Sequence, residues 1–138
     1  MPNQNITTNS FKAWVLAARP KTLTGAASPV MVGLSMASTD GHIQFIPALL
    51  CFLFAFLMQI DANLINDYYD FKKGIDNAKR LGPKRACAEG WITVPVMRKG
   101  ILLLTALSCL TGLPLVYYGG PTMILIGMVC VVFCFLYT

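Results

Sequence analysis

The sequence contains few charged residues, and long stretches of it contain none. Of its 138 residues only 17 are Asp, Glu, Lys or Arg, which is 12%, whereas about 25% is usual for a soluble domain. No charge lies between Lys21 and Asp40, between Asp40 and Asp61, or anywhere from residue 100 to residue 138. This scarcity excludes an ordinary water-soluble globule, because too few charges remain to cover its surface.

Cysteine and histidine are too few and too scattered for a disulfide framework or a zinc site. The five cysteines form no Cys-x-x-Cys pair, and His42 is the only histidine. The EF-hand spacing and the Walker A sequence are also missing, which excludes those calcium and nucleotide sites. The first residues are too polar for a cleaved signal peptide. Nucleic acid is not an expected partner.

The uncharged gaps have the length of membrane-spanning helices. Residues 22–39 and 41–60 provide 18 and 20 residues, close to the ~20 that cross a bilayer as a helix. The run 100–138 is long enough for two crossings, and Gly119-Gly120-Pro121 divides it into a helical hairpin. We therefore predict an all-α, polytopic transmembrane bundle with four spans, at about 22–39, 43–66, 100–118 and 122–138.

The basic residues all lie on one side of these predicted spans. Three precede the first span, and the turns expected near 40–42 and 119–121 contain no Lys or Arg. By the positive-inside rule, the N-terminus and a cap loop over 70–99 are cytoplasmic. The eight basic residues of that loop are Lys72, Lys73, Lys79, Arg80, Lys84, Arg85, Arg98 and Lys99.

The sequence stops inside an apolar helix, at residues 131–138, without a polar or basic flank. Membrane spans normally end in interfacial or charged residues. We therefore expect residues 1–138 to be the N-terminal portion of a single, longer membrane domain.

Four oxygen-bearing side chains line one face of the second predicted helix where it leaves the bilayer. Asn63, Asn66, Asp67 and Asp70 fall within a sector of about 100° at 100° per residue. Carboxylates and amides with no basic residue among them favour a Mg²⁺ site over a merely solvated helix end. Because Mg²⁺ completes its shell with water and substrate phosphate, the pattern predicts a metal and phosphate site.

Cations follow this acidic face in the predicted cap loop. Arg80 and Arg85 are suited to neutralise a diphosphate, while Lys72 and Lys73 are explained by topology and contact with anionic lipid. Asp61 lies on the opposite side of the helix from the acidic face. It is therefore a separate buried acid. The sequence leaves three alternatives for it: it is protonated, it pairs with another helix, or it lines an acceptor pocket.

Three motifs together resemble the UbiA superfamily of membrane prenyltransferases, and in particular its branch that acts on 1,4-dihydroxy-2-naphthoate in menaquinone synthesis. The resemblance runs from about Trp14 to the end of the sequence. The motifs are Arg19-Pro20-Lys21-Thr22-Leu23, Asn66-Asp67-Tyr68-Tyr69-Asp70 with Gly74-Ile75-Asp76, and Arg80-Leu81-Gly82-Pro83-Lys84-Arg85.

The resemblance implies a helical intramembrane barrel with a polar cap, in a bacterial inner membrane. It implies Mg²⁺-dependent transfer of a polyprenyl group from polyprenyl diphosphate to 1,4-dihydroxy-2-naphthoate, with loss of CO₂, to give demethylmenaquinone. Asn63, Asn66, Asp67, Asp70 and Asp76 would hold Mg²⁺, with Asp67 and Asp70 as catalytic residues. The diphosphate would be bound by Arg19, Lys21, Arg80, Lys84 and Arg85. Asp61 departs from the small residue expected at its position.

Two kinds of alternative remain open. A related prenyltransferase would use another aromatic acceptor, such as 4-hydroxybenzoate or a haem or chlorophyll precursor. A cation-coupled transporter would place the same acids in a conduction path, although the other spans carry none. A purely structural membrane subunit is the third reading.

Overall fold

The computed structural model describes residues 8–41, 43–74 and 86–136. These residues form five α-helices and one short 3-10 helix, and none of them is in a β-strand. The predicted all-α class is therefore confirmed. The elements are α1 (Phe11–Ala18), η1 (Pro20–Thr22), α2 (Leu23–Thr39), α3 (Phe45–Lys72), α4 (Val94–Gly119) and α5 (Thr122–Leu136).

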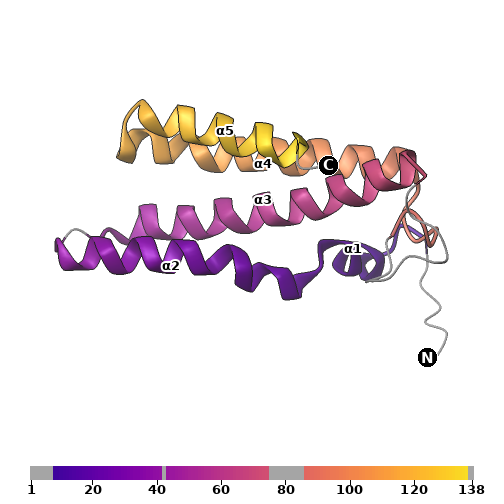
Figure 1. Cartoon of the computed structure of the whole chain (residues 1–138), viewed down its shortest axis with the longest axis horizontal. Helices are drawn as coiled ribbons and strands as arrows, with labels where there is room; N and C mark the ends of the chain where they lie inside the picture. Colours follow the sequence, from indigo (N-terminus) through magenta and orange to yellow (C-terminus); the bar gives the residue numbers. More distant parts are fainter. Residues whose placement is uncertain (1–7, 42, 75–85, 137–138) are drawn as a thin grey trace.

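The long helices lie roughly alongside one another, with α3 between α2 and the pair formed by α4 and α5 (Figure 1). The α2–α3 and α4–α5 turns lie at one end of the bundle (Figure 1). The short helix α1, the end of α3 and the start of α4 lie at the other end, called here the cap end. This arrangement places the acidic face of α3 at the cap end.

Local sequence explains where the elements begin and end. The Ser10 side chain accepts a hydrogen bond from the N–H of Ala13 and so caps the start of α1. Arg19 adopts a left-handed backbone conformation (φ 51°, ψ 70°), and Pro20 then begins η1. Gly120 ends α4 with φ 80°, a conformation that favours glycine. The helix α1 was not predicted from the sequence.

Two helices, α3 and α4, are long and apolar enough to cross a membrane. Only 6% and 17% of their most apolar windows are buried inside the bundle, so most of this apolar surface faces outward. The helices α2 and α5 are shorter, with 17 and 15 residues. The connection between α3 and α4 is shorter than the predicted 70–99 loop, because residues 70–72 continue α3 and residues 94–99 begin α4.

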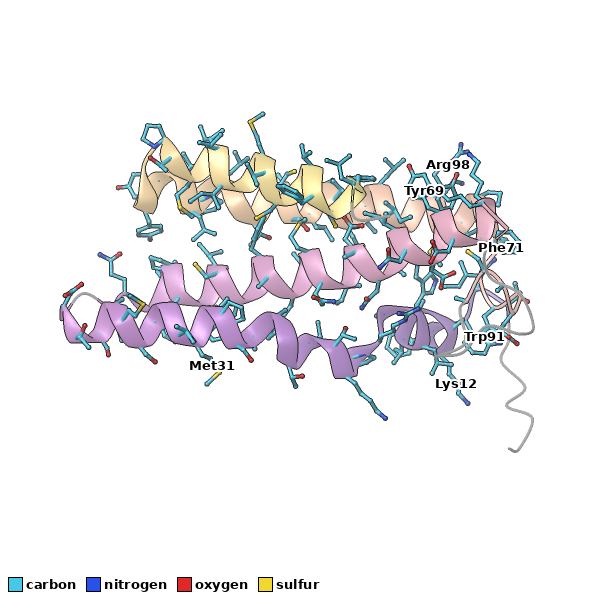
Figure 2. All side chains as sticks on the ribbon, viewed as in Figure 1. Lys12, Met31, Tyr69, Phe71, Trp91 and Arg98 are labelled. Atoms are coloured by element: carbon cyan, nitrogen blue, oxygen red, sulfur yellow. The ribbon has the colours of Figure 1, made fainter. Side chains whose placement is uncertain are left out.

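The buried core is concentrated at the cap end. It joins side chains of α1, α3, α4 and the 86–92 segment, and its fully buried members include Ala13, Ile65, Ala86, Ile92 and Met97. Along the spans, by contrast, large apolar side chains point outward, as Met31 of α2 does (Figure 2). Tight packing therefore holds the cap end together, while the long helices present an apolar surface.

Candidate functional site at the cap end of α3

The predicted acidic face forms part of one continuous helix. Asn63, Asn66, Asp67 and Asp70 all lie in the last turns of α3, so they share a face as predicted. Their environments differ, however. Asn63 and Asp67 are 5% and 1% exposed, whereas Asn66 and Asp70 are half-buried. The four side chains therefore do not form one uniform donor set.

Asn63 binds the N-terminal part of the chain. Its Nδ2 donates to the carbonyl of Ala18 at 2.8 Å and to Oγ1 of Thr22 at 2.9 Å. The Thr22 hydroxyl in turn donates to the carbonyl of Arg19 at 2.8 Å. These bonds fasten the left-handed turn at Arg19 and the 3-10 helix η1 onto α3.

Asp67 binds the segment that precedes α4. Its Oδ2 accepts a hydrogen bond from the backbone N–H of Ala86 at 2.8 Å, and its Oδ1 accepts one from the N–H of Cys87 at 2.9 Å. Both donors are consecutive backbone amides, an arrangement that suits an anionic carboxylate. Asp67 therefore joins α3 to the segment 86–93, called here the cap segment.

The cap segment is closed on itself and bound to the N-terminal segment. The carbonyl of Ala86 accepts hydrogen bonds from the N–H groups of Trp91 at 2.8 Å and Ile92 at 3.4 Å. The carbonyl of Trp91 accepts one from the N–H of Asn9 at 2.8 Å, and Asn9 Oδ1 accepts one from the N–H of Thr93 at 3.2 Å. Segments distant in sequence thus form a single layer over the end of α3.

A separate polar contact lies on another side of α3. Arg98, in the first turns of α4, donates to the hydroxyl of Tyr68 at 3.4 Å, and the ammonium of Lys72 lies 5.6 Å from the Tyr68 ring centroid. Figure 2 shows Arg98 and Tyr69 at the cap end, near the end of α3. Tyr68 is 6% exposed. This contact joins α3 to α4 and takes no part in the acidic face.

Asp61 is also paired with α4, deeper along the bundle. Its side chain is fully buried, and its Oδ2 accepts a hydrogen bond from Thr105 at 2.6 Å. Its Oδ1 is buried and has no hydrogen-bond partner among the described residues. Of the three alternatives left open by the sequence, the structure supports pairing with another helix.

Several predicted site residues lie outside the described residues. These are Asp76, Arg80, Lys84 and Arg85. Of the predicted N-terminal cations, Arg19 is half-buried in its turn and Lys21 is exposed in η1. Within the described part of the chain, no three His, Cys, Asp or Glu residues gather into a metal-binding group.

Three residues of this architecture were not singled out from the sequence: Asn9, Thr22 and Thr105. The sequence could have indicated Thr105, because a hydroxyl within an apolar helix commonly forms a hydrogen bond to a neighbouring helix. Thr22 lies inside the Arg19–Leu23 motif, but its bond to Asn63 spans 41 residues. Asn9 forms one hydrogen bond through its backbone N–H and one through its side chain, both to residues more than 80 positions away, and the sequence does not indicate these partners.

A shallow depression of about 590 Å³ lies on α2, away from these residues. It is lined by Val32, Ser35, Met36, Thr39 and Asp40, near the α2–α3 turn and thus at the end of the bundle opposite the cap (Figure 1). Its position gives it no contact with the acidic face.

Comparison with known proteins decides the family. The sequence matches the UbiA prenyltransferase family over residues 26–138. The chain belongs to the UbiA prenyltransferase family. This membership and the apolar helices confirm the predicted UbiA-type helical membrane fold. No solved structure matches the chain significantly.

The UbiA relatives include named bacterial and vertebrate proteins. A 1,4-dihydroxy-2-naphthoate octaprenyltransferase of Escherichia coli is 40% identical over 112 residues, which cover 81% of this chain and 36% of the relative. The protein of that name from Mycobacterium tuberculosis is 34% identical over 129 residues, covering 94% and 44%. The UbiA prenyltransferase domain-containing protein 1 of Danio rerio is 32% identical over 123 residues, covering 78% and 36%. The chain thus spans less than half the length of these relatives.

Proposed function

We propose that the full-length protein transfers a polyprenyl group from a polyprenyl diphosphate to 1,4-dihydroxy-2-naphthoate in a Mg²⁺-dependent reaction. The observation that carries the proposal is the oxygen-bearing face of α3 at the end of an apolar helix, where Asn66 and Asp70 lie one turn apart. The names of the relatives from Escherichia coli and Mycobacterium tuberculosis support the naphthoate as acceptor.

The chemistry of Asn66 and Asp70 fits Mg²⁺. One amide and one carboxylate oxygen are hard donors, and residues four apart on a helix have Cβ atoms about 5–6 Å from each other. Both side chains are half-buried, so a ligand can reach them, whereas Asn63 and Asp67 are buried against other segments. Asp76 completes the proposed ligands. When bound there, Mg²⁺ supplies positive charge that stabilises the departing diphosphate.

In this proposal, five basic residues bind the diphosphate oxygens. Arg19 and Lys21 flank Pro20 in the turn that Asn63 holds against α3. Arg80, Lys84 and Arg85 precede the cap segment in the sequence. Guanidinium groups suit this role, because they form paired hydrogen bonds to phosphate.

The apolar helices accommodate the isoprenoid tail and exclude water. The outward surfaces of α3 and α4 are apolar, and water there would hydrolyse the reactive allylic centre. In the reaction, the allylic C–O bond breaks and diphosphate leaves. The ring carbon that carries the carboxylate then forms the new C–C bond, and that carboxylate leaves as CO₂. The product is the prenylated dihydroxynaphthalene, the reduced form of demethylmenaquinone.

We place this reaction at the cytoplasmic face of a bacterial inner membrane. The basic residues of the described ranges lie toward the cap end, and the described parts of the turns at the opposite end carry no Lys or Arg. By the positive-inside rule, the cap end faces the cytoplasm.

A panel of acceptors tests the proposal. The purified full-length protein would receive a polyprenyl diphosphate and Mg²⁺ with either 1,4-dihydroxy-2-naphthoate, 4-hydroxybenzoate or a haem precursor, and the products would be identified by mass spectrometry. We expect prenylated product with the naphthoate alone. Product with another acceptor and none with the naphthoate would overturn the assignment. Ion flux in proteoliposomes without diphosphate release would favour a transporter.

A further inference from the structure

Both carboxylate oxygens of Asp67 accept hydrogen bonds from backbone amides of the cap segment. The side chain is 1% exposed, so water and solutes have almost no access to it. Two N–H bonds of 2.8 and 2.9 Å to an anionic oxygen pair are strong and directional. A metal ligand at this position would have to share its oxygens with these amides inside a closed environment.

The amides that Asp67 binds belong to Ala86 and Cys87, the first two residues of the cap segment. The N–H of Ala86 belongs to the peptide unit that begins at Arg85, and consecutive Cα atoms are about 3.8 Å apart. Asp67 therefore fixes the position of Ala86, the residue that follows Lys84 and Arg85 in the sequence. The other end of the cap segment is fixed independently, through Trp91 and Asn9.

We propose that Asp67 is a positioning residue that holds the entry of the cap segment on α3, and that it acts on the reaction through the diphosphate-binding cations rather than as a ligand of Mg²⁺. The expected effect on the KM for polyprenyl diphosphate rests on the proposed function. The anchoring itself rests on the two hydrogen bonds alone. Asn66 and Asp70, one residue before and three residues after Asp67, remain the candidates for the ion.

Kinetics of the full-length Asp67→Asn variant separate the two roles. Asparagine offers one acceptor oxygen, and its NH₂ group faces one of the two backbone donors, so one hydrogen bond is replaced by a repulsive contact. We expect the KM for polyprenyl diphosphate to rise about tenfold, while the Mg²⁺ concentration for half-maximal rate changes by less than roughly twofold. A shift in the Mg²⁺ requirement as large as that of Asp70→Asn would overturn the proposal, as would unchanged kinetics.

A backbone variant tests the same hydrogen bonds without altering the carboxylate. Cys87→Pro removes the N–H that donates to Oδ1, whereas Cys87→Ala keeps it and serves as the matched control. We expect Cys87→Pro to raise the KM for diphosphate as Asp67→Asn does, and Cys87→Ala to leave it unchanged. Equal effects of the two substitutions would assign the change to the lost thiol and contradict the proposal.

Limited trypsin digestion provides a readout that does not depend on activity. Loss of the anchor should quicken cleavage after Lys84 and Arg85 by about fivefold or more, because cleavage follows local opening. Faster cleavage in Asp67→Asn, combined with no prenyl transfer by the wild type, would sustain the anchor and reject the proposed function. Unchanged cleavage in Asp67→Asn and Cys87→Pro would reject the anchor.

Discussion

The side-chain amide of Asn63 lies 2.9 Å from the hydroxyl of Thr22, although 41 residues separate them in the sequence. Thr22 is at the same time a donor to the carbonyl of Arg19. Arg19 has φ 51°, which few residues other than glycine adopt. The pair therefore stabilises a turn of unusual conformation that carries two proposed diphosphate-binding cations.

The first prediction concerns this pair. Thr22→Val removes the hydroxyl that is hydrogen-bonded to Asn63 and to the carbonyl of Arg19. The turn at Arg19 should therefore be bound less firmly to α3. The bond to Asn63 is the one that joins the turn to α3. Its loss costs about 1 kcal/mol, which corresponds to roughly a fivefold change. We expect the KM for polyprenyl diphosphate to rise by about that factor in steady-state assays, with little change in kcat. Thr22→Ser retains the hydroxyl and should behave as wild type; equal effects of Val and Ser would count against the role of this bond.

The second prediction concerns the buried pair of Asp61 and Thr105. Thr105→Val leaves both oxygens of Asp61 without a partner in the described bundle. We expect thermal unfolding in detergent to show a loss of about 1–3 kcal/mol. Asp61→Leu should be neutral or stabilising, because a buried polar group is replaced by an apolar one.

The double-mutant cycle of these substitutions measures their coupling. In the Asp61→Leu background, Thr105→Val should have almost no effect on the free energy of unfolding, which gives a coupling energy above about 1 kcal/mol. Additive effects of the two substitutions would show that the hydrogen bond contributes nothing measurable.

The third prediction concerns the close approach of α1 and α4. A Cβ atom at Gly100 would lie 2.5 Å from the Trp14 ring, closer than packed atoms tolerate. Gly100→Ala should therefore lower the free energy of unfolding by about 1–3 kcal/mol. Gly127→Ala in α5 is the matched control, because nothing lies within 4 Å of its Cβ position. If both variants unfold at the wild-type temperature, α1 does not pack on α4 as described.

The fourth prediction concerns the proposed metal ligand Asp70. Asp70→Asn should lower kcat at least about tenfold, equivalent to ~1.4 kcal/mol in the barrier, and raise the Mg²⁺ concentration needed for half-maximal rate. Asp40→Asn changes an exposed acid at the opposite end of the bundle and should leave both quantities unchanged. Wild-type rates for Asp70→Asn at all Mg²⁺ concentrations would exclude Asp70 as a ligand.

Much of the fold could be predicted from where charges are missing. Residues 45–60 of the gap at 41–60 lie within α3, and the run from residue 100 contains most of α4 and all of α5. The sequence predicts this span only from residue 100, because the charges of Arg98 and Lys99 indicate a loop. They lie instead in the first turns of a helix whose Pro95 suits a helix start.

The acidic face was predictable because it depends only on the period of a helix. The different environments of its members were not, because they arise from distant parts of the chain. Asp67 binds the backbone amides of Ala86 and Cys87. Because every residue except proline has a backbone N–H, the sequence does not show which one Asp67 binds. The bond of Asn63 to Ala18 likewise joins residues 45 positions apart. A sequence pattern gives the chemistry of a face but not the partner that each side chain takes.

The most direct test of the account is the release of diphosphate by the purified full-length protein, measured with and without 1,4-dihydroxy-2-naphthoate and with Mg²⁺ or a chelator. Prenyl transfer predicts release that requires both substrates and Mg²⁺, with one CO₂ formed for each diphosphate. Release that continues in the chelator would contradict Mg²⁺ dependence. No release with both substrates and Mg²⁺ present would contradict the proposed prenyl transfer itself.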